Sequence, residues 1–252
     1  MEIRYLENNE KNKIRELYDK VFNDSCEFVD YYFKKISNND ILVVEDEGNI
    51  LSMLQLVKKN VICNGEEKNV HYIYGVATDE KHRGQGYMRL LMERALKDLK
   101  KLDDPFVYLT PADASIYIKF GFEPVYDKQI YEMRNIEDKN KIYKPKEIDI
   151  QIMKVVCDNI LPVKYKVYIN HDEAYLREII NQLVIDGGYL TYQKEKEEII
   201  GYSIVGSNGE VWESVFDTKP VNLVHKKTLP WIMIKKFDET MEIGKVFIND
   251  ET

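Results

Sequence analysis

A glycine-containing loop constrains this chain more than any other feature. It reads Arg83-Gly84-Gln85-Gly86-Tyr87-Met88, between a strand-like run at 70–78 and a helix whose apolar residues recur at the helical period. Such a loop presents unpaired backbone N–H groups and the positive end of the helix dipole, which together bind phosphate oxygens. Glycine lets the backbone come close, and Arg83 adds positive charge. We therefore expect a pyrophosphate-binding loop.

Two other phosphate-binding loops fit this sequence less well. A Walker loop needs a Gly-Lys-Ser/Thr ending, and the dinucleotide fingerprint needs G-x-G-x-x-G after the first strand. Neither pattern is present. The alternative is an ordinary tight loop before a helix, so the surrounding elements must decide between the two interpretations.

The elements around the loop alternate between helix and strand. Apolar spacing and turn residues predict, in order, a strand at 2–6, helices at 14–21 and 28–36 (the second capped by Asp24 or Ser25), a hairpin of 41–45 and 50–57, and the strand 70–78. After the loop come a helix at 88–99, a strand at 106–110, a short helix ending at Gly121 and a strand at 122–133. The run Thr110-Pro111-Ala112-Asp113 resembles a capping box with proline at the first helical position.

A polar stretch divides the chain. Residues 135–146 are almost entirely polar and include Pro145, which predicts a domain boundary. Beyond it, a helix at 172–184, a strand at Tyr189, a charged turn and a strand at 199–205 repeat the order of the first half. We interpret this as a weak internal repeat, although helix plus hairpin is a common arrangement.

Composition limits the class of protein. The formal net charge is -8, which argues against a nucleic-acid partner and suits a cationic substrate, although surface acid also serves solubility. Three cysteines match neither a metal knuckle nor a redox pair, and we expect no metal. No run has the length of a signal peptide core or a membrane span, so a cytoplasmic protein without a membrane partner is expected.

The loop and the order of elements resemble the GNAT superfamily of acetyltransferases over residues 1 to about 135. Its motif, R/Q-x-x-G-x-G/A, matches as Arg83-x-x-Gly86-x-Met88, with methionine in place of the last small residue. The helix N-terminus can still donate its amides whatever that side chain is. The resemblance implies an α/β (α+β) fold, with a mixed, mostly antiparallel central sheet flanked by helices, and acetyl-CoA as co-substrate.

A closer resemblance is to the enhanced-intracellular-survival (Eis-like) type of multidomain acetyltransferase. It rests on the cofactor segment, on Ser115-Ile116-Tyr117-Ile118-Lys119-Phe120-Gly121-Phe122 and on Pro230-Trp231-Ile232-Met233-Ile234-Lys235-Lys236-Phe237-Asp238. It implies a catalytic domain at 1–137 and a degenerate GNAT-like domain at 138–252 that helps form the acceptor pocket. The family's third, sterol-carrier-like domain is expected to be absent.

The resemblance also implies roles for individual residues. Main-chain groups of Val76, Ala77 and Thr78 would pair with the amides of pantetheine, like an added strand. The loop from Arg83 to Met88 would hold the pyrophosphate. Tyr117 would be the acid that protonates the departing thiolate, although any one tyrosine among eighteen is more commonly a packing residue. The base would be the terminal carboxylate of Thr252, or else Glu251; an exposed tail is the alternative.

The predicted function is transfer of an acetyl group from acetyl-CoA to a primary amine of a polyamine-like or aminoglycoside-like small molecule. Acetylation of protein lysines or N-termini is an alternative within enzymes. A non-catalytic acyl-CoA-binding sensor is an alternative outside them. The family resemblance also suggests a homo-oligomer.

Overall fold

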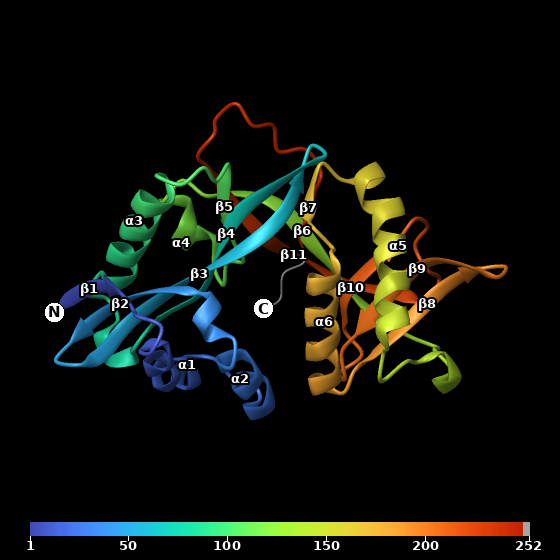
Figure 1. Cartoon of the computed structure of the whole chain (residues 1–252), viewed down its shortest axis with the longest axis horizontal. Coiled ribbons are helices and arrows are strands. Elements are labelled where there is room, and N and C mark those ends of the chain that lie inside the picture. Colours follow the sequence, from blue (N-terminus) through green and yellow to red (C-terminus); the bar gives the residue numbers. More distant parts are fainter. Residues whose placement is uncertain (249–252) are drawn as a thin grey trace.

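The computed structural model describes residues 1–248 and contains two sheets (Figure 1). Within these residues, nine strands form the larger sheet, in the order β1-β2-β3-β4-β5-β11-β6, with β7 joined to β3 and β12 joined to β7. Its strands are β1 (Glu2–Tyr5), β2 (Asp40–Asp46), β3 (Asn49–Cys63), β4 (Glu66–Thr78), β5 (Phe106–Leu109), β6 (Glu123–Met133), β7 (Val167–Ile169), β11 (Leu223–Lys236) and β12 (Val246–Phe247). Among the described pairs, only β4–β5 and β7–β12 are parallel. The predicted fold class, with its mostly antiparallel sheet flanked by helices, is confirmed.

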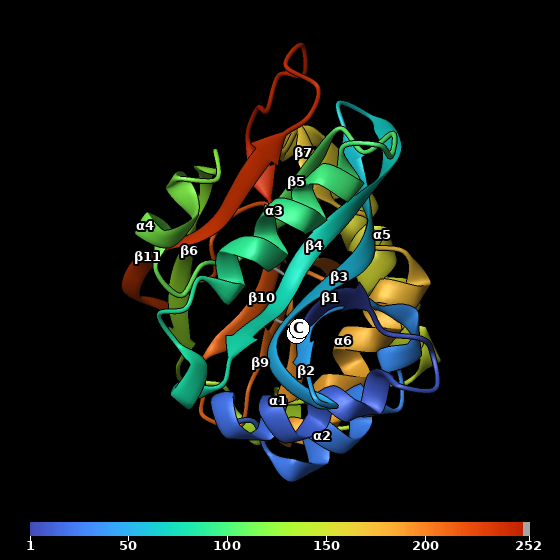
Figure 2. The same cartoon turned by 90° about the vertical axis from the view of Figure 1, so that its left-hand side faces the viewer.

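Helices cover both faces of the larger sheet. α1 (Arg15–Val21) and α2 (Cys26–Phe33) bury their apolar residues against one face, together with Met53 and Ala77. α3 (Tyr87–Leu99) packs on the opposite face with α4 (Ala114–Ile118), and Figure 2 shows α3 lying across the strands. Burial of one side of each helix follows from the three- and four-residue spacing of its apolar positions.

A strand from late in the sequence completes the larger sheet. β11 lies between β5 and β6 and pairs with both in antiparallel register, with Met233 opposite Leu109 and Leu223 opposite Met133. The proposed catalytic domain at 1–137 therefore shares its sheet with residues 223–236. The sequence boundary at 137/138 stays a prediction about the start of the second unit.

The smaller sheet belongs to the second half. It consists of β8 (Tyr189–Glu195), β9 (Glu198–Val205) and β10 (Val211–Phe216) in the order β10-β9-β8, all antiparallel. α5 (Glu147–Lys164) and α6 (Glu173–Asp186) pack on it and enclose a separate apolar core that includes Met153, Leu176 and Ile204. This half stands beside the first, and α6 faces α2 (Figure 1).

Local signals in the sequence have mixed outcomes. Ser25 caps α2 by accepting a hydrogen bond of 3.2 Å from the N–H of Phe28, one of the two predicted caps. The capping box at Thr110 is wrong. Asp113 is the N-cap of α4 and accepts a bond of 2.9 Å from the Ser115 N–H, so Pro111 lies before the helix and not inside its first turn.

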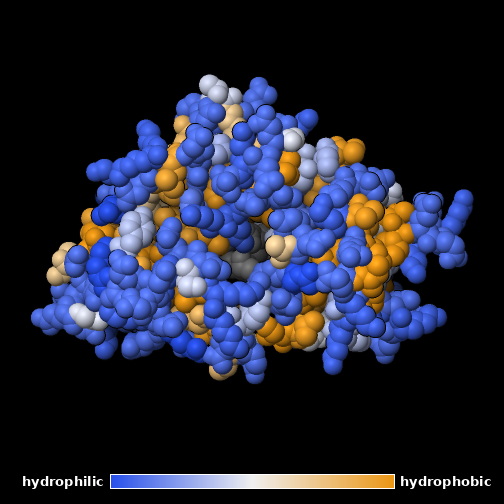
Figure 3. Space-filling view, in the orientation of Figure 1, coloured by the Kyte–Doolittle hydropathy of each residue, from blue (hydrophilic) through white to orange (hydrophobic). Residues whose placement is uncertain are grey.

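The surface of the molecule is mainly hydrophilic on the face seen in Figure 3, with an apolar area over α5 on the right. Val155 and Val163, both on α5, are among the exposed apolar side chains of the protein. None of the helices in residues 1–248 is long and apolar enough to cross a lipid bilayer.

Candidate functional site

The N-terminus of α3 is an open cluster of backbone donors. Gly84 and Gly86 have φ angles of 77° and 82°, in the left-handed region that favours glycine, and Gly86 is the N-cap with no side-chain hydrogen bond. The helix ladder starts with a bond of 3.1 Å from the N–H of Leu90 to the carbonyl of Gly86. The preceding N–H groups have no carbonyl within the helix to bond, and Arg83 to Gly86 are exposed. This arrangement suits a phosphate.

The pairing between β4 and β5 stops before β4 ends. The two strands pair only from His71 opposite Val107 to Ile73 opposite Leu109, where β5 ends. β4 runs on to Thr78, paired on its other side with β3. Val76, Ala77 and Thr78 all lie in this extension, so one edge of their backbone has no strand paired with it among the described residues. An open strand edge can pair with an extended ligand that carries amide groups.

A bulge bends β4 where it leaves β5. Tyr74 pairs with Gln55 and Ala77 with Met53, so two residues of β4 stand opposite one residue of β3. Gly75, inside the bulge, has a φ of 58°, and a Cβ built on it would lie 2.6 Å from Nε2 of Gln55. The backbone angle therefore favours glycine here, and any larger residue would also have to displace the end of the Gln55 side chain.

The remaining loop side chains have distinct surroundings. The guanidinium Nε of Arg83 donates to the carbonyl of Thr78 at 3.4 Å, which keeps the arginine near the end of β4. Gln85 accepts a bond of 2.8 Å from the hydroxyl of Tyr87. Tyr87 and Met88 pack against the core under α3. The methionine that departs from the family motif thus points its side chain to the core and leaves the loop backbone uncovered.

Tyr117 lies on α4, and its side chain belongs to the core cluster under α3. Its side chain is 8% exposed and packs edge-on against Phe122, with ring centroids 6.2 Å apart. Val76, on the open part of β4, packs against that same core cluster. Burial raises the pKa of Tyr117, so the phenol keeps its proton at neutral pH and can serve as a donor.

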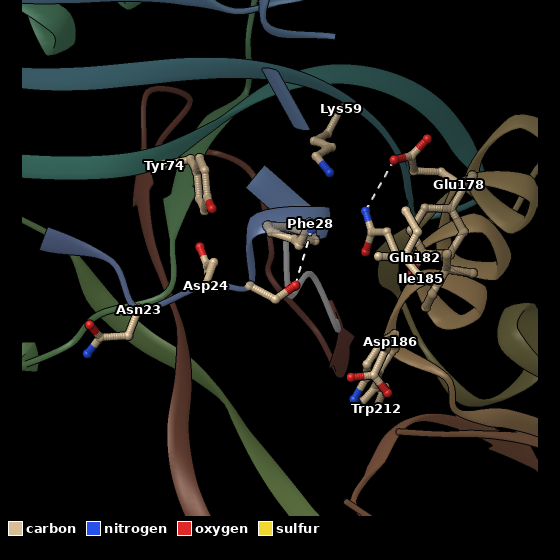
Figure 4. Close-up of a pocket in the computed structure, with 13 residues that line it drawn as sticks. Asn23, Asp24, Phe28, Lys59, Tyr74, Glu178, Gln182, Ile185, Asp186 and Trp212 are labelled. Atoms are coloured by element: carbon tan, nitrogen blue, oxygen red, sulfur yellow. Dashed lines mark hydrogen bonds between the residues drawn. The ribbon is translucent and has the colours of Figure 1, made fainter. Parts of the chain in front are cut away.

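A cavity of about 340 Å³ lies between the two halves, between α2 and α6. Figure 4 shows Lys59 and Tyr74 on its first-half side and Glu178, Gln182 and Asp186 on its second-half side. The lining also includes Asn23, Asp24, Ser25, Phe28, Tyr175, Ile179, Ile185 and Trp212. Three carboxylates and the ammonium group of Lys59 line it, and one of the carboxylates, Glu178, is paired with Lys35. The remaining excess of one negative charge favours a positively charged guest.

Tyr74 connects the cavity to the bulged strand. Its hydroxyl is 2.7 Å from that of Tyr18, which donates to Asp24 at 2.7 Å (Figure 4 shows the Tyr74 hydroxyl pointing toward Asp24). Because the single Tyr18 proton goes to the carboxylate, the proton between the two phenols belongs to Tyr74. Tyr74 sits directly before the bulge at Gly75, so the cavity lining and the open edge of β4 are adjacent along one strand.

The sequence analysis expected the second domain to help form a pocket, but it named none of the residues that line this cavity. A signal did exist on α6, because Tyr175, Glu178, Gln182 and Asp186 recur at helical spacing beside the buried stripe. What the sequence lacked was the pairing of α6 with α2. The two proposed bases, Thr252 and Glu251, lie outside the described residues, which end one position after β12.

Comparison with known proteins gives one matching family model and several solved structures with a similar fold. Residues 2–125 match the family model described as "Acetyltransferase (GNAT) domain". No curated protein sequence matches the chain.

Three solved structures are similar over both halves and cover 94% of this chain. A probable N-acyltransferase of Enterococcus faecalis V583 is 15% identical, with a TM-score of 0.74 and 72% of its own chain covered. A GCN5-related N-acetyltransferase of Anabaena variabilis is 14% identical, with a TM-score of 0.67 and 73% covered. Eis1 of Mycobacterium abscessus is 11% identical, with a TM-score of 0.66 and 74% covered. At these identities the likeness concerns the fold alone.

Proposed function

Residues 2–125 belong to the acetyltransferase (GNAT) domain family, and from this we propose that the chain transfers the acetyl group of acetyl-CoA to a primary amine of a small cationic molecule. The observation that carries the proposal is the open edge of β4 beyond its pairing with β5, followed in the chain by the N-terminus of α3, which has no side-chain cap. An extended pantetheine and a pyrophosphate need these two features side by side.

The cofactor is proposed to lie along the open edge of β4. Val76, Ala77 and Thr78 hold the pantetheine arm through main-chain groups. The N–H groups from Gly84 to Met88, with Arg83 beside them, hold the pyrophosphate. The exposed loop and the two left-handed glycines support this proposal because neither glycine carries a side chain that could cover the donors.

Tyr117 is proposed as the acid. Amine attack on the thioester produces a tetrahedral intermediate, and the sulfur leaves with a proton from the phenol. The support is its burial in the core that also receives Val76 and its raised pKa. The carboxylate of Thr252, or else Glu251, stays the proposed base, and removal of residues 250–252 tests it. Unchanged kcat in a folded truncation would remove that proposal.

The acceptor is proposed to bind in the cavity between the halves. Its carboxylates at Asp24 and Asp186, together with Glu178, which also pairs with Lys35, suit a polyamine-like or aminoglycoside-like cation. Acetylation of a protein lysine is the alternative. The second half, 138–252, is then a degenerate GNAT-like unit that supplies one wall. Homo-oligomeric assembly is a separate proposal, tested by sedimentation.

The decisive experiment measures acetyl-CoA binding by calorimetry for the parent and for a Gly84→Asp, Gly86→Asp double variant. The parent should bind, and the variant should lose binding because two carboxylates face the pyrophosphate. A thiol-release assay with spermidine then tests transfer. Binding without acetylation of any amine would favour the acyl-CoA sensor; no binding by the folded parent would contradict the proposed function.

A further inference from the structure

A buried ion pair lies behind one wall of the interdomain cavity. His171, just before α6, and Glu213, on β10, are 3% and 1% exposed, and Nε2 of the histidine is 3.1 Å from Oε2 of the glutamate. The same oxygen accepts a bond of 2.8 Å from the hydroxyl of Tyr175. The other glutamate oxygen accepts one of 2.6 Å from Tyr202. Burying charge this deeply is costly unless the partners are well placed.

The hydrogen bonds define where the protons are. Nδ1 of His171 lies 2.6 Å from the carbonyl of Ile169, which can only accept, so Nδ1 carries a proton. Two phenol donors on Glu213 stabilise its carboxylate form, and Nε2 then carries a proton as well. Burial alone would raise the pKa of Glu213 and lower that of His171, but their mutual attraction and the hydrogen bonds reverse both directions. The pair is therefore an imidazolium and a carboxylate.

Tyr175 links this pair to the cavity. It belongs to the cavity lining, whereas Tyr202 on β9 is 1% exposed and does not. Because the Tyr175 proton is donated to Glu213, its oxygen can make further hydrogen bonds only as an acceptor. The opposite wall repeats the arrangement, since the Tyr74 proton is directed through Tyr18 to Asp24. Two phenols facing one cavity thus have their protons committed to carboxylates behind them.

We propose that Glu213, held by His171, is a positioning residue that fixes Tyr175 as a hydrogen-bond acceptor for the amine bound in the cavity. The inference rests on the proposed function for the identity of the guest as an amine. It assigns the buried pair of the second half a part in acceptor recognition. Such an oxygen accepts a hydrogen bond from an ammonium or amine N–H. A guest that carries only hydrogen-bond acceptors could not bond to Tyr175, because the phenol proton is donated to Glu213.

The test uses spermidine as the probe, with KM and kcat from thiol release and Kd from calorimetry in the presence of CoA. Tyr175→Phe removes the acceptor, and Glu213→Gln supplies an amide N–H that turns the hydroxyl proton outward. Each change should raise KM and Kd about tenfold, the effect of losing one hydrogen bond to a charged group, while kcat stays within about twofold. The double variant should be no worse than the worse single variant.

Tyr202→Phe is the matched control. It removes the other phenol on Glu213 without touching the cavity lining, so KM should be unchanged even if the protein is less stable. Nitrogen-15 NMR of the histidine rings gives a second readout: the parent should show His171 protonated on both nitrogens at pH 7, and Glu213→Gln should show it neutral.

The outcomes separate this inference from the proposed function. Spermidine binding that weakens as expected in a protein without turnover would support the inference and contradict the proposed function. Normal turnover with an unchanged KM in Tyr175→Phe would overturn the inference alone. A neutral His171 in the parent, or no spermidine binding at all, would also overturn it.

Discussion

Two helix N-termini in this molecule differ in how their first backbone N–H groups are capped. α3 begins after Gly86, which is in the left-handed region and offers no side chain to its N–H groups. α6 begins after Asp172, whose carboxylate accepts a bond of 2.8 Å from the N–H of Tyr175. The end of α6 is thus capped by its own sequence, whereas the end of α3 has no side-chain cap, as the proposed pyrophosphate site requires.

The two sheets differ in the same sense. In the larger sheet, β4 parts from β5 after Ile73 and leaves one edge open. In the smaller sheet, β8 and β9 stay paired from Tyr189 and Val205 to the turn at Glu195 and Glu198. Helices and hairpins occur in a similar order in the two halves. Of the two helix ends and two strand pairs compared, only those of the first half leave backbone groups without a partner in the described residues. This difference supports the proposal that the first half alone binds acetyl-CoA.

The largest expected effect tests whether the acid lies in the first half, at Tyr117. Tyr117→Phe should lower kcat about 100-fold or more, because the thiolate loses its acid, while acetyl-CoA affinity stays the same. Steady-state thiol release and calorimetry measure the two quantities. Tyr192→Phe is the control in the second half, where the hydroxyl donates to Asp149 at 2.8 Å, and it should leave kcat unchanged. Equal kcat in Tyr117→Phe and the parent would reject the acid.

A second prediction gives the N-terminus of α3 a side-chain cap like that of α6. Gly86→Asp should give α3 a carboxylate like that of Asp172 and weaken acetyl-CoA binding about 100-fold, through repulsion and the loss of hydrogen bonds to a charged group. Gly86→Asn keeps the shape without the charge and separates the two causes, with a smaller loss expected. Calorimetry at constant ionic strength measures both. Parent-like affinity in the aspartate variant would mean that phosphate binds elsewhere.

The sequence predicted best what is local and periodic. The spacing of Leu91, Met92, Ala95 and Leu99 places α3 on the sheet, and the turn at residues 46–49 joins β2 to β3. The loop before α3 was likewise recognisable, because its two glycines directly precede the periodic apolar residues of the helix. These features need no knowledge of distant residues.

What the sequence did not predict depends on distant contacts. The 18-residue helix α5 went unrecognised because it contains Pro162 and follows a polar stretch taken as a linker. The sequence analysis predicted no strand at β11, yet β11 pairs with β5 and β6, at least 90 positions earlier. The cavity needed α2 beside α6, a pairing that neither helix specifies alone. Pairings of this kind arise from tertiary packing and leave no periodic signal.

The bulge in β4 offers a third prediction. Gly75→Ala should lower the free energy of unfolding by about 2 kcal/mol or more, because φ is 58° and the new Cβ would meet Gln55 at 2.6 Å. Gly187→Ala, at the end of α6, is the control: φ is 79° but the space is open, so only the backbone cost of about 1 kcal/mol applies. Urea unfolding measures both. Equal costs would show that the close approach at Gly75 is relieved by movement of Gln55.

The smallest expected effect completes the comparison from the second half. Asp172→Ala removes the cap of α6 and should cost about 1 kcal/mol, which lowers Tm by about 2–4 °C in a chain of this size. Asp172→Asn, a cap of similar strength, should restore most of the loss. Acetyl-CoA affinity should be the same in all three proteins, because this helix end is closed by the chain itself. Weaker cofactor binding in Asp172→Ala, measured by calorimetry below the transition, would contradict the assignment of the cofactor to the first half alone.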